Sequence, residues 1–470
     1  MKLTLTQIAR WLAADPGPAA DSIAATGYSI DSRTLHPGDL FFAIHGERFD
    51  GHDFLAVAFE RGASSAIVAR SRLAALPEAA KAKPILAVDD PLAALQRLAA
   101  AVRRHWGKRV IGITGSAGKT TTKEAVAAVL SARFQVLKSQ GNRNNGYGLP
   151  LQILRLEPEH EIAVVEMGMS AAGEIAALCR IAAPDWGVVT NVGHAHAESF
   201  PDGVAGIARA KYELVAALPR HGAAFLNCDD PYVSQFGRDF EGRAVYFGRG
   251  PCADPRADDV QVLGAGGLRM HIRAGEQYAD LHLRLPGEHN AANALAAIAV
   301  GLEAGIPLAA CCAALEQLRP EDKRGQMLQI NGATIINDSY NSNPEALQSM
   351  IAMLRGTPAS RRILVAGEML ELGREAAALH AACGKAAAEA SIDIVLGVRG
   401  NASHIVDAAR AHGSEALLVE SPEAAGAWLR DHLQPGDAVL LKASRGVRLE
   451  RALDVLTPPE KDAGPHSPAR

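Results

Sequence analysis

The sequence predicts an α/β protein built from three domains. Its 470 residues exceed the size of one domain, and about 150 residues per domain would give about three. From residue 109 onward, short apolar runs alternate with helical patterns, which is typical of parallel sheets covered by helices. The alternation restarts near residue 335. We therefore expect a small α+β domain at residues 1–107, a central parallel-sheet domain at 108–319 and a Rossmann-like α/β domain at 320–457.

The composition favours a soluble protein that binds small molecules. Hydrophobic residues make up 48% of the chain and charged residues 21%, which supports large cores and excludes a wholly disordered chain. Lys and Arg total 48 against 52 Asp and Glu, a net charge of −4. We therefore expect no nucleic-acid partner held by bulk positive charge.

The cysteines and the apolar segments indicate a cytoplasmic protein. No Cys-x-x-Cys pair and no zinc-like histidine spacing occurs, so we expect reduced, buried thiols. The N-terminus lacks the apolar core of a signal peptide, and the most apolar stretch, 294–315, is interrupted by Glu303, Gly305 and Pro307. We expect no membrane insertion, and a monomer is the default. The cysteines are Cys179, Cys228, Cys252, Cys311, Cys312 and Cys383.

The first domain is predicted from short elements. An amphipathic helix at the N-terminus ends near Pro16, and strand-like pieces follow at 27–30 and 39–44. Apolar periodicity at 92–102 predicts a helix that leads into the central domain. At the other end of the chain, the polar, proline-rich tail 458–470 is expected to be disordered.

The two parallel-sheet domains are each predicted from a series of strands and helices. A helical segment at 290–304, ended by Gly305 and Pro307, precedes the boundary between them. Central strands are expected at 110–114, 162–166, 187–191 and 223–227, and central helices at 119–131, 171–181 and 204–218. Strands of the last domain are expected near 335 and at 363–366, 392–396 and 438–441.

A glycine-rich loop follows the first central strand and opens a helix. It reads Gly115-Ser116-Ala117-Gly118-Lys119-Thr120-Thr121. Glycines let backbone N–H groups surround phosphate oxygens, and the helix N-terminus adds partial positive charge. Lys119 would reach the β- and γ-phosphates of ATP, and the Thr120 hydroxyl would ligate Mg²⁺. In the full GxxxxGK[ST] spacing the first glycine would fall at Ile113, so an incidental glycine-rich turn is the alternative.

Polar side chains follow the other central strands, at the edge where open α/β sheets bind ligands. Glu166 ends the second strand, His194 and His196 follow the third, and Asp229 and Asp230 follow the fourth. Mg²⁺ prefers carboxylate and phosphate oxygens, which makes Glu166 a candidate ligand. Spacing alone does not separate His194 from His196, and each of these residues could instead belong to an ordinary loop.

Two further features are candidates for the site. The turn-forming run Gly141-Asn142-Arg143-Asn144-Asn145 lies between the glycine-rich-loop helix and Pro150. We assign Asn142 to the catalytic set and Asn144 and Asn145 to substrate binding. Lys211 lies on a predicted helix, where the alternative is an ordinary solvated lysine.

These motifs resemble those of the Mur ligases, a family of ATP-dependent, amide-forming ligases of bacterial peptidoglycan synthesis. The resemblance covers residues 28–450. It is closest to the branch that adds D-alanyl-D-alanine to UDP-N-acetylmuramoyl-tripeptide. The stretches that carry this choice are 337–344 (NDSYNSNP), 141–150, and 367–373 followed by His380. The first is the most specific, because sister ligases have a different run there.

The resemblance implies the metal site. Glu166 matches a magnesium-ligating glutamate, and Asn191 with His196 matches an Asn-x-x-x-x-His element, which favours His196 over His194. Lys211 matches a lysine that relatives carbamylate with CO₂, a reaction that requires a lysine buried enough to lose its proton. One or two Mg²⁺ ions would thus be held by Thr120, Glu166, His196 and Lys211.

The resemblance also implies nucleotide and substrate contacts. Asn290 belongs to an element that contacts adenine, and Arg324 and Asp338 match groups that the last domain contributes to the nucleotide. Two segments of the first domain, 31–33 and 46–54, resemble the part that holds UDP. The implied substrate residues are Ser32, Arg33, Gly46, Asp50, His52, Tyr340, Asn341, Asn343, Ser444 and Arg445.

The implied reaction is ATP-driven amide formation through an acyl phosphate, with Lys119, His196, Lys211 and Asn142 as catalytic residues. One alternative is a sister ligase or a folylpolyglutamate-type ligase that adds a single amino acid and lacks the 337–344 run. Another is a P-loop NTPase or kinase that needs no amine. A nucleotide-binding protein with a degenerate site is disfavoured by the intact Gly118-Lys119-Thr120 core.

Overall fold

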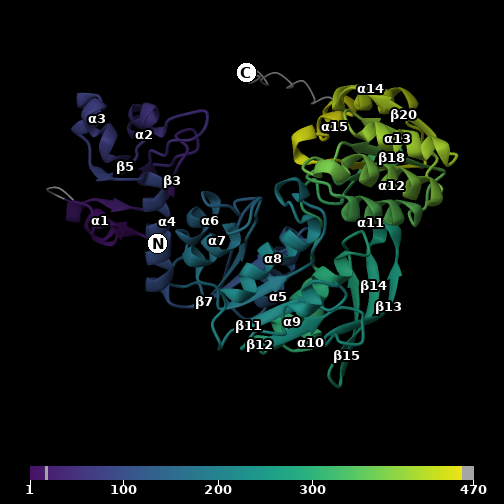
Figure 1. Ribbon diagram of the computed structural model, residues 1–470, viewed down its shortest axis with the longest axis horizontal. Coiled ribbons are helices and arrows are strands. Elements are labelled where there is room, and N and C mark those ends of the chain that lie inside the picture. Colours follow the sequence, from purple (N-terminus) through teal and green to yellow (C-terminus); the bar gives the residue numbers. More distant parts are fainter. Residues whose placement is uncertain (16–19, 458–470) are drawn as a thin grey trace, which may run out of the picture.

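The structure, a computed structural model, describes residues 1–15 and 20–457. It confirms the predicted three-domain α/β architecture, with separate sheets in the N-terminal, central and C-terminal parts of the chain. Figure 1 shows the N-terminal domain in purple, the central domain in teal and the C-terminal domain in yellow-green. The predicted disordered tail, 458–470, and Pro16 lie outside the described residues.

The N-terminal domain contains a four-stranded, fully parallel sheet and a separate antiparallel strand pair. Its first helix forms because Thr4 and Gln7 make a capping box and because Leu5, Ile8 and Leu12 share one buried face. The strands are β1 (Leu3–Thr4), β2 (Ala24–Ala25), β3 (Gly27–Ser29), β4 (Asp39–Phe42), β5 (Ser65–Ala69) and β6 (Ile85–Val88), and the helices are α1 (Leu5–Leu12), α2 (Leu55–Glu60), α3 (Glu78–Lys81) and α4 (Pro91–Trp106).

The central domain is a six-stranded parallel sheet between helices. Its strands are β7 (Arg109–Thr114), β8 (Val136–Lys138), β9 (Ile162–Glu166), β10 (Trp186–Val189), β11 (Ala223–Asn227) and β12 (Arg243–Phe247), and the helices among them are α5 (Lys119–Leu130), α6 (Gly148–Ile153), α7 (Glu174–Ala182) and α8 (Gly203–Ala216). The sheet order is β12-β11-β10-β7-β9-β8. The chain leaves β9 and returns as β10 on the opposite side of β7, so the carboxyl end of β7 is a topological switch point, where such sheets bind ligands.

An antiparallel sheet that was not predicted extends the central domain. Its strands are β13 (Arg256–Val262), β14 (Leu268–Ala274) and β15 (Gln277–Leu283), and the helices α9 (Asn290–Glu303) and α10 (Leu308–Glu316) follow. Leu268, Met270 and Ile272 of β14 are buried at every second position and share one core with α9 and the main sheet. This core explains why α9 is apolar along nearly its whole surface.

The C-terminal domain is a second six-stranded sheet, in the order β16-β17-β21-β18-β19-β20. All neighbouring strands are parallel except β16, which pairs antiparallel with β17. The strands are β16 (Gln326–Ile330), β17 (Ala333–Asn337), β18 (Arg361–Gly367), β19 (Ile394–Val398), β20 (Glu415–Val419) and β21 (Asp437–Lys442), and the helices are α11 (Pro344–Arg355), α12 (Ala376–Glu389), α13 (Ala402–Ala411), α14 (Pro422–His432) and α15 (Arg451–Leu456).

The prediction that all six cysteines are reduced and buried is wrong for one pair. Cys228 and Cys252 form a disulfide bond, and Cys252 lies on the surface. Cys228 follows β11 directly, and the loop after the neighbouring strand β12 returns over the end of β11, which brings Cys252 to it. A separation of 24 residues in sequence gives no sign of this proximity. The four other cysteines are free and buried.

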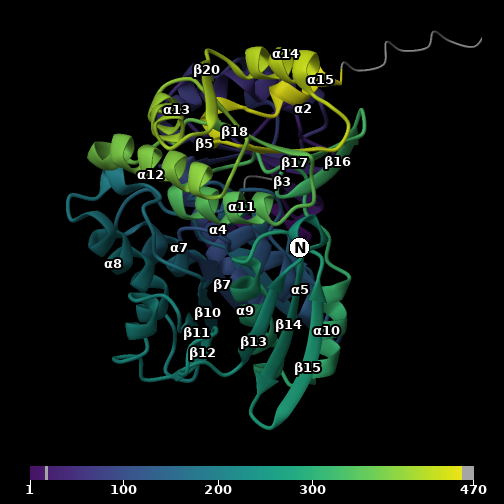
Figure 2. The ribbon, with the colours of Figure 1, turned by 90° about the vertical axis from the view of Figure 1, so that its right-hand side faces the viewer.

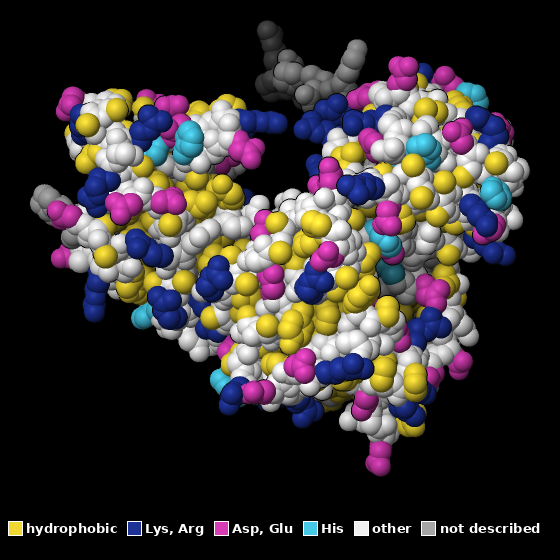
Figure 3. All heavy atoms as spheres, in the orientation of Figure 1, with side chains coloured by type: hydrophobic (Ala, Val, Ile, Leu, Met, Phe, Trp, Pro, Cys, Tyr) yellow, Lys and Arg dark blue, Asp and Glu magenta, His cyan; other side chains and the backbone are white. Residues whose placement is uncertain are grey.

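The three domains surround an open hollow. Figures 1 and 3 show the N-terminal domain standing away from the C-terminal domain, with the central domain beneath both. The view of Figure 2 places α11 and α12 of the C-terminal domain above the strands of the central domain. Among the helices that are described, none has the length and apolar character needed to cross a membrane.

Candidate active site

A cavity of about 360 Å³ lies where the central domain faces the C-terminal domain. The glycine-rich loop after β7, the end of β9 and the start of α9 line it from the central side, and the segment after β17 lines it from the other. The predicted site residues that it brings together are Ser116, Ala117, Gly118, Lys119, Thr120, Thr121, Asn142, Asn144, Asn145, Glu166, His196, Lys211, Asn290, Arg324, Asp338, Tyr340, Asn341, Asn343 and Arg445.

At two positions of the loop between β7 and α5, the backbone conformation and the surrounding space suit only glycine. Gly115 has φ +153° and Gly118 has φ +78°, values that L side chains rarely adopt. A Cβ on Gly115 would lie 1.8 Å from Thr190 Oγ1, and one on Gly118 would lie 2.4 Å from Asn293 Oδ1. Gly115 therefore shapes the turn, while Ile113, at the first position of the full spacing, lies inside the strand.

The end of β10 holds this loop in place. The backbone N–H groups of Ser116 and Ala117 donate to the carbonyl and side-chain oxygens of Asn191, at 3.0 and 2.8 Å. The Thr190 hydroxyl donates to the Ala117 carbonyl at 2.6 Å. The loop is thus preorganised by its own neighbours, which gives Asn191 a structural role.

Lys119 folds back over its own loop. Its Nζ donates to the Gly115 carbonyl at 2.7 Å. Burial lowers the pKa of Lys119, the Glu166 carboxylate opposes that shift, and the Arg324 guanidinium reinforces it. Two cations and one carboxylate therefore face the same space, an excess of positive charge that suits a polyphosphate.

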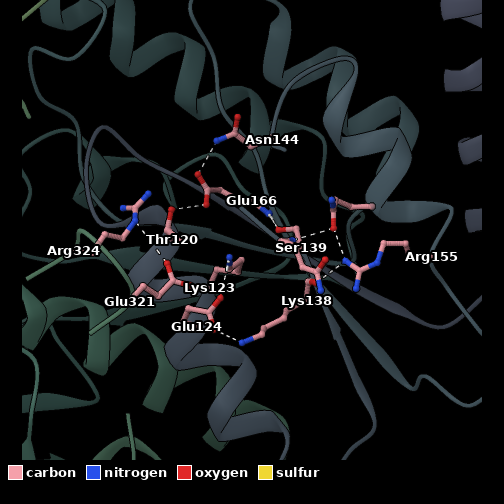
Figure 4. Close-up of polar contacts among 12 residues, drawn as sticks. Thr120, Lys123, Glu124, Lys138, Ser139, Asn144, Arg155, Glu166, Glu321 and Arg324 are labelled. Atoms are coloured by element: carbon pink, nitrogen blue, oxygen red, sulfur yellow. Dashed lines mark hydrogen bonds and ion pairs between the residues drawn. The ribbon is translucent and has the colours of Figure 1, made fainter. Parts of the chain in front are cut away.

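Glu166 is buried at the end of β9 and is held through both carboxylate oxygens. Thr120 Oγ1 donates to Oε2 at 2.8 Å, and Asn144 Nδ2 donates to Oε1 at 2.7 Å (Figure 4). A buried carboxylate beside a hydroxyl fits a hard cation such as Mg²⁺, which also takes oxygens from phosphate and water. The described residues contain no group of three or more His, Cys, Asp or Glu that could hold a metal by itself.

Lys211 projects from α8 into the same cavity and is 2% exposed. No hydrogen bond or ion pair joins its side chain to another residue that the structure describes. Burial lowers the pKa of Lys211 well below its usual value, and the charge of Lys119 lowers it further. Such a setting favours the neutral form of the amine, which is the nucleophilic form.

The two histidines after β10 lie in different places. His196 lines the cavity, and its Nδ1 pairs with Glu371 Oε2 at 2.5 Å, a hydrogen bond that lowers the pKa of Glu371. His194 is not among the lining residues, and its Nδ1 pairs with Glu345 Oε1 at 2.6 Å. Both carboxylates belong to the C-terminal domain, so both histidines also join the two domains. The geometry favours His196 as the site residue.

The loop at 141–145 lines the cavity with three asparagines. Asn142 lines it, and its backbone carbonyl accepts a hydrogen bond from the Asn144 backbone at 2.8 Å. Asn144 orients Glu166, as described above. The Oδ1 of Asn145 accepts hydrogen bonds from the backbone of Tyr147 and Gly148, at 3.2 and 2.9 Å, and so shapes the start of α6. Asn144 and Asn145 thus have structural bonds besides the substrate contacts predicted for them.

The start of α9 closes one end of the cavity. The Asn290 side chain donates to the Pro286 carbonyl and accepts from Asn293, both at 2.8 Å. The Asn293 oxygen in turn accepts from the Thr122 hydroxyl at 3.0 Å, which ties α9 to α5. The predicted adenine contact is therefore part of a fixed amide network.

Residues before β16, after β17 and at the end of β21 close the opposite side. The Arg324 guanidinium lies over the Tyr340 ring, 4.0 Å from its centroid. Lys442 Nζ donates to Asp338 Oδ2 at 2.5 Å and to the Asn341 carbonyl at 3.0 Å. Lys442 opens the run Lys442-Ala443-Ser444-Arg445, which resembles an element near the incoming amine substrate. Lys442 ends β21 and Asp338 follows β17, its parallel neighbour, so both lie at the ligand-binding edge.

Three other predicted substrate residues make hydrogen bonds within the protein. Asn341 Oδ1 accepts from the Arg445 backbone at 3.3 Å. Asn343 caps α11, because its Oδ1 accepts a backbone N–H of the first turn at 2.8 Å. Ser444 Oγ accepts from the Leu370 backbone at 2.9 Å and does not line the cavity.

The residues predicted to hold UDP lie apart from the cavity, on the N-terminal domain (Figure 1). His52 Nε2 accepts from the Ala69 backbone, so its Nδ1 carries the proton that faces Asp50 at 2.5 Å. Burial raises the pKa of Asp50, but the hydrogen bonds from His52 and the charge of Arg72 outweigh this and lower it to about 2. The predicted residues here are Ser32, Arg33, Gly46, Asp50 and His52.

Fold and site together define an α/β nucleotide-binding protein whose C-terminal domain covers a phosphate-binding loop. Three segments match known families: residues 24–103 match "Mur ligase family, catalytic domain", residues 113–301 match "Mur ligase middle domain" and residues 323–445 match "Mur ligase, glutamate ligase domain". The chain belongs to the Mur ligase family.

Individual relatives span nearly the whole chain. The UDP-N-acetylmuramoyl-tripeptide–D-alanyl-D-alanine ligase of Bacillus subtilis is 35% identical over 92% of this chain and 93% of its own. The crystal structure of MurF from Acinetobacter baumannii superposes with a TM-score of 0.87 at 29% identity, over 97% of this chain and 99% of that one. The structure of MurF ligase from Thermotoga maritima in complex with ADP superposes with a TM-score of 0.80 at 30% identity, over 91% of this chain and 96% of that one.

Proposed function

We propose that this protein is an ATP-dependent ligase that joins D-alanyl-D-alanine to the terminal carboxylate of UDP-N-acetylmuramoyl-tripeptide. The product is the pentapeptide precursor of bacterial peptidoglycan. The observation that carries the proposal is that the 337–344 run faces an intact phosphate-binding loop across one cavity, in a chain 35% identical to a ligase of this name. A protein that only hydrolyses ATP has no need of the 337–344 run on the side of the cavity opposite the phosphate-binding loop.

The reaction has two steps. A carboxylate oxygen of the tripeptide attacks the γ-phosphorus of ATP, which forms an acyl phosphate and releases ADP. The dipeptide amine then attacks the acyl carbon, and phosphate leaves from the tetrahedral intermediate. Lys119 and Arg324 face the cavity from its two sides and would neutralise the phosphoryl oxygens in the first step.

Magnesium fits the residues around Glu166. We assign Thr120, Glu166, His196 and Lys211 to one or two ions, which when bound would neutralise phosphate charge. His196 pairs with Glu371 through Nδ1, and this leaves Nε2 for a metal. The neutral amine of Lys211 can attack CO₂ and lose a proton to give a carbamate, an anionic ligand that a protonated lysine could not provide.

The second step needs no strong dedicated base. An α-amino group has a pKa of about 7.7–8.0, so a useful neutral fraction exists at pH 7. Closure of the domains around the cavity would protect the acyl phosphate from water. We place the enzyme in the bacterial cytoplasm, as a monomer.

The test is phosphate release from ATP and Mg²⁺ with UDP-N-acetylmuramoyl-tripeptide, measured with and without D-alanyl-D-alanine. We expect release only when both substrates are present, and a product heavier by the dipeptide in mass spectrometry. Release with a single amino acid in place of the dipeptide would move the protein to a sister ligase. ATP turnover with neither substrate would show an NTPase instead.

A further inference from the structure

A cluster of charged side chains connects Arg324 to the helix that follows the phosphate-binding loop. Figure 4 shows Glu321 between Arg324 on one side and Lys123 and Glu124 of α5 on the other. The Arg324 Nε lies 3.7 Å from Glu321 Oε2. The side chains of Glu321 and Glu124 are hydrogen-bonded to each other. The cluster therefore bridges the central domain and the segment that leads into β16.

The Glu124 end of the cluster is fixed by two lysines. Lys123 is 1% exposed, and its Nζ lies 2.9 Å from Glu124 Oε1. Lys138 at the end of β8 pairs with the other carboxylate oxygen. One lysine at each oxygen holds Glu124 in place as a carboxylate. Because α5 begins at Lys119 and Thr120, this anchor belongs to the same rigid helix as the phosphate-binding residues.

The other end of the cluster reaches the nucleotide cavity. A narrow space of about 30 Å³ is lined by Thr121, Glu124, Glu321 and Arg324, and also by Asn290. Thr121, Asn290 and Arg324 line the main cavity as well. The carboxyl pair therefore lies directly behind the wall that Arg324 presents to a nucleotide.

We propose that Glu321 is a positioning residue for Arg324. Its carboxyl group, hydrogen-bonded to Glu124 on the phosphate-binding helix, holds the Arg324 guanidinium at the nucleotide. Arg324 would otherwise be held mainly by the Tyr340 ring, which restrains the plane of the guanidinium but not its reach. The proposal rests on the proposed function, since it takes ATP as the ligand of the cavity.

The contact between the two carboxyl groups requires one proton. Partial burial and the charge of Glu124 raise the pKa of Glu321, against the lowering effect of Lys123 and Arg324. Burial also acts to raise the pKa of Glu124, but Lys138 and Lys123 outweigh it and lower that pKa. Of the two carboxyl groups, Glu321 is therefore the one that more readily takes the proton, which it can donate to Glu124 while its carbonyl oxygen faces Arg324.

This assignment makes glutamine the correct mimic of Glu321. A glutamine amide can donate to the Glu124 carboxylate and accept from Arg324, as the protonated acid does. Glu321→Gln should therefore keep the affinity for ADP, measured by titration calorimetry with Mg²⁺, and the KM for ATP within about twofold. Glu321→Ala should weaken both about tenfold while kcat changes less than threefold, a loss of about 1.4 kcal/mol.

The matched control is Asp322→Asn, which removes a carboxylate from the next residue, where the side chain is 70% exposed and, among the residues that the structure describes, pairs with Lys323 alone. It should change neither constant. Arg324→Ala should weaken ADP binding, and adding Glu321→Ala to it should cost nothing more. Additive losses in that double variant, or a Glu321→Gln enzyme as weak as Glu321→Ala, would overturn the proposal.

Failure of the proposed nucleotide-binding function can be distinguished from failure of the positioning role of Glu321. If the unaltered protein binds no ADP, the nucleotide function itself is wrong. If it binds ADP and Lys119→Ala abolishes binding, while Glu321→Ala binds normally, only the positioning role is wrong. Thermal unfolding of each variant separates loss of binding from loss of the fold.

Discussion

At the scale of single residues, two of the lysines that line the cavity, Lys119 and Lys211, lie in contrasting surroundings. Lys119 is bonded to its own loop and faces Glu166, whereas Lys211 has no bonded partner in the described chain and meets only the charge of Lys119. The first arrangement keeps a cation at the phosphates. The second favours a neutral amine, and so two lysines in one cavity can have two different chemical roles.

Replacement of Lys211 tests the second role. Lys211→Ala should reduce ligation by about 100-fold, and added acetate or another short carboxylic acid should restore part of the rate by replacing the carbamate oxygens. Turnover is measured by phosphate release at several acid concentrations. Lys385→Ala, which alters an exposed lysine on α12, is the control. A Lys211→Ala enzyme with an unchanged rate would remove the carbamate from the mechanism.

The two histidines after β10 should respond differently to substitution. His196→Ala removes a cavity-lining ring and should reduce kcat about 100-fold. His194→Ala removes a contact with Glu345 outside the cavity and should cost less than about tenfold. Steady-state kinetics with all three substrates measures both effects. The reverse ranking would assign the site role to His194.

At the scale of elements, α11 is capped by Asn343, a residue that the resemblance predicts to contact substrate. Glu345, in the first turn of this helix, reaches across to His194. Capping therefore positions the contact between the two domains. The capping bond of Asn343 also shows that a motif resemblance does not by itself tell a ligand-binding residue from one that shapes the loop around the ligand.

Asn343 allows these two roles to be separated. Asn343→Ala should lower the free energy of unfolding by about 1 kcal/mol, because the first turn of α11 loses its cap. Asn343→Ser keeps a capping oxygen and should retain both stability and activity. Urea unfolding and the ligation rate are the measurements. A serine variant that is stable but inactive would show that the amide itself contacts substrate.

The sequence was informative where local chemistry and position in the fold coincide. The strands at 162–166 and 223–227 were predicted with the observed bounds, and the rule that ligands bind at carboxyl ends of strands found Lys119 and Glu166. The antiparallel strands β13–β15 were missed, because their half-buried alternation resembles polar loops. The Cys228–Cys252 bond and the Glu321–Glu124 pair depend on distant segments meeting, which no local pattern reports.

At the scale of the whole molecule, the predicted substrate site is divided between domains. The C-terminal domain already contacts the central domain through the two histidine–glutamate pairs. The predicted UDP residues, in contrast, lie across the open hollow seen in Figure 3. One substrate must bridge both parts, with UDP on the N-terminal domain and its carboxylate at the γ-phosphate. Binding should therefore draw the N-terminal domain inward.

Small-angle X-ray scattering measures this closure. A compact chain of 470 residues has a radius of gyration of about 23 Å. The radius of gyration of the free protein should exceed this value. Binding of UDP-N-acetylmuramoyl-tripeptide together with a non-hydrolysable ATP analogue should reduce the radius toward that of a compact chain. ADP alone should change little, because the domains that enclose the nucleotide are already in contact. A radius that falls with ADP alone would place the moving joint between the central and C-terminal domains, and no change with both ligands would mean that the substrate spans the hollow without closure.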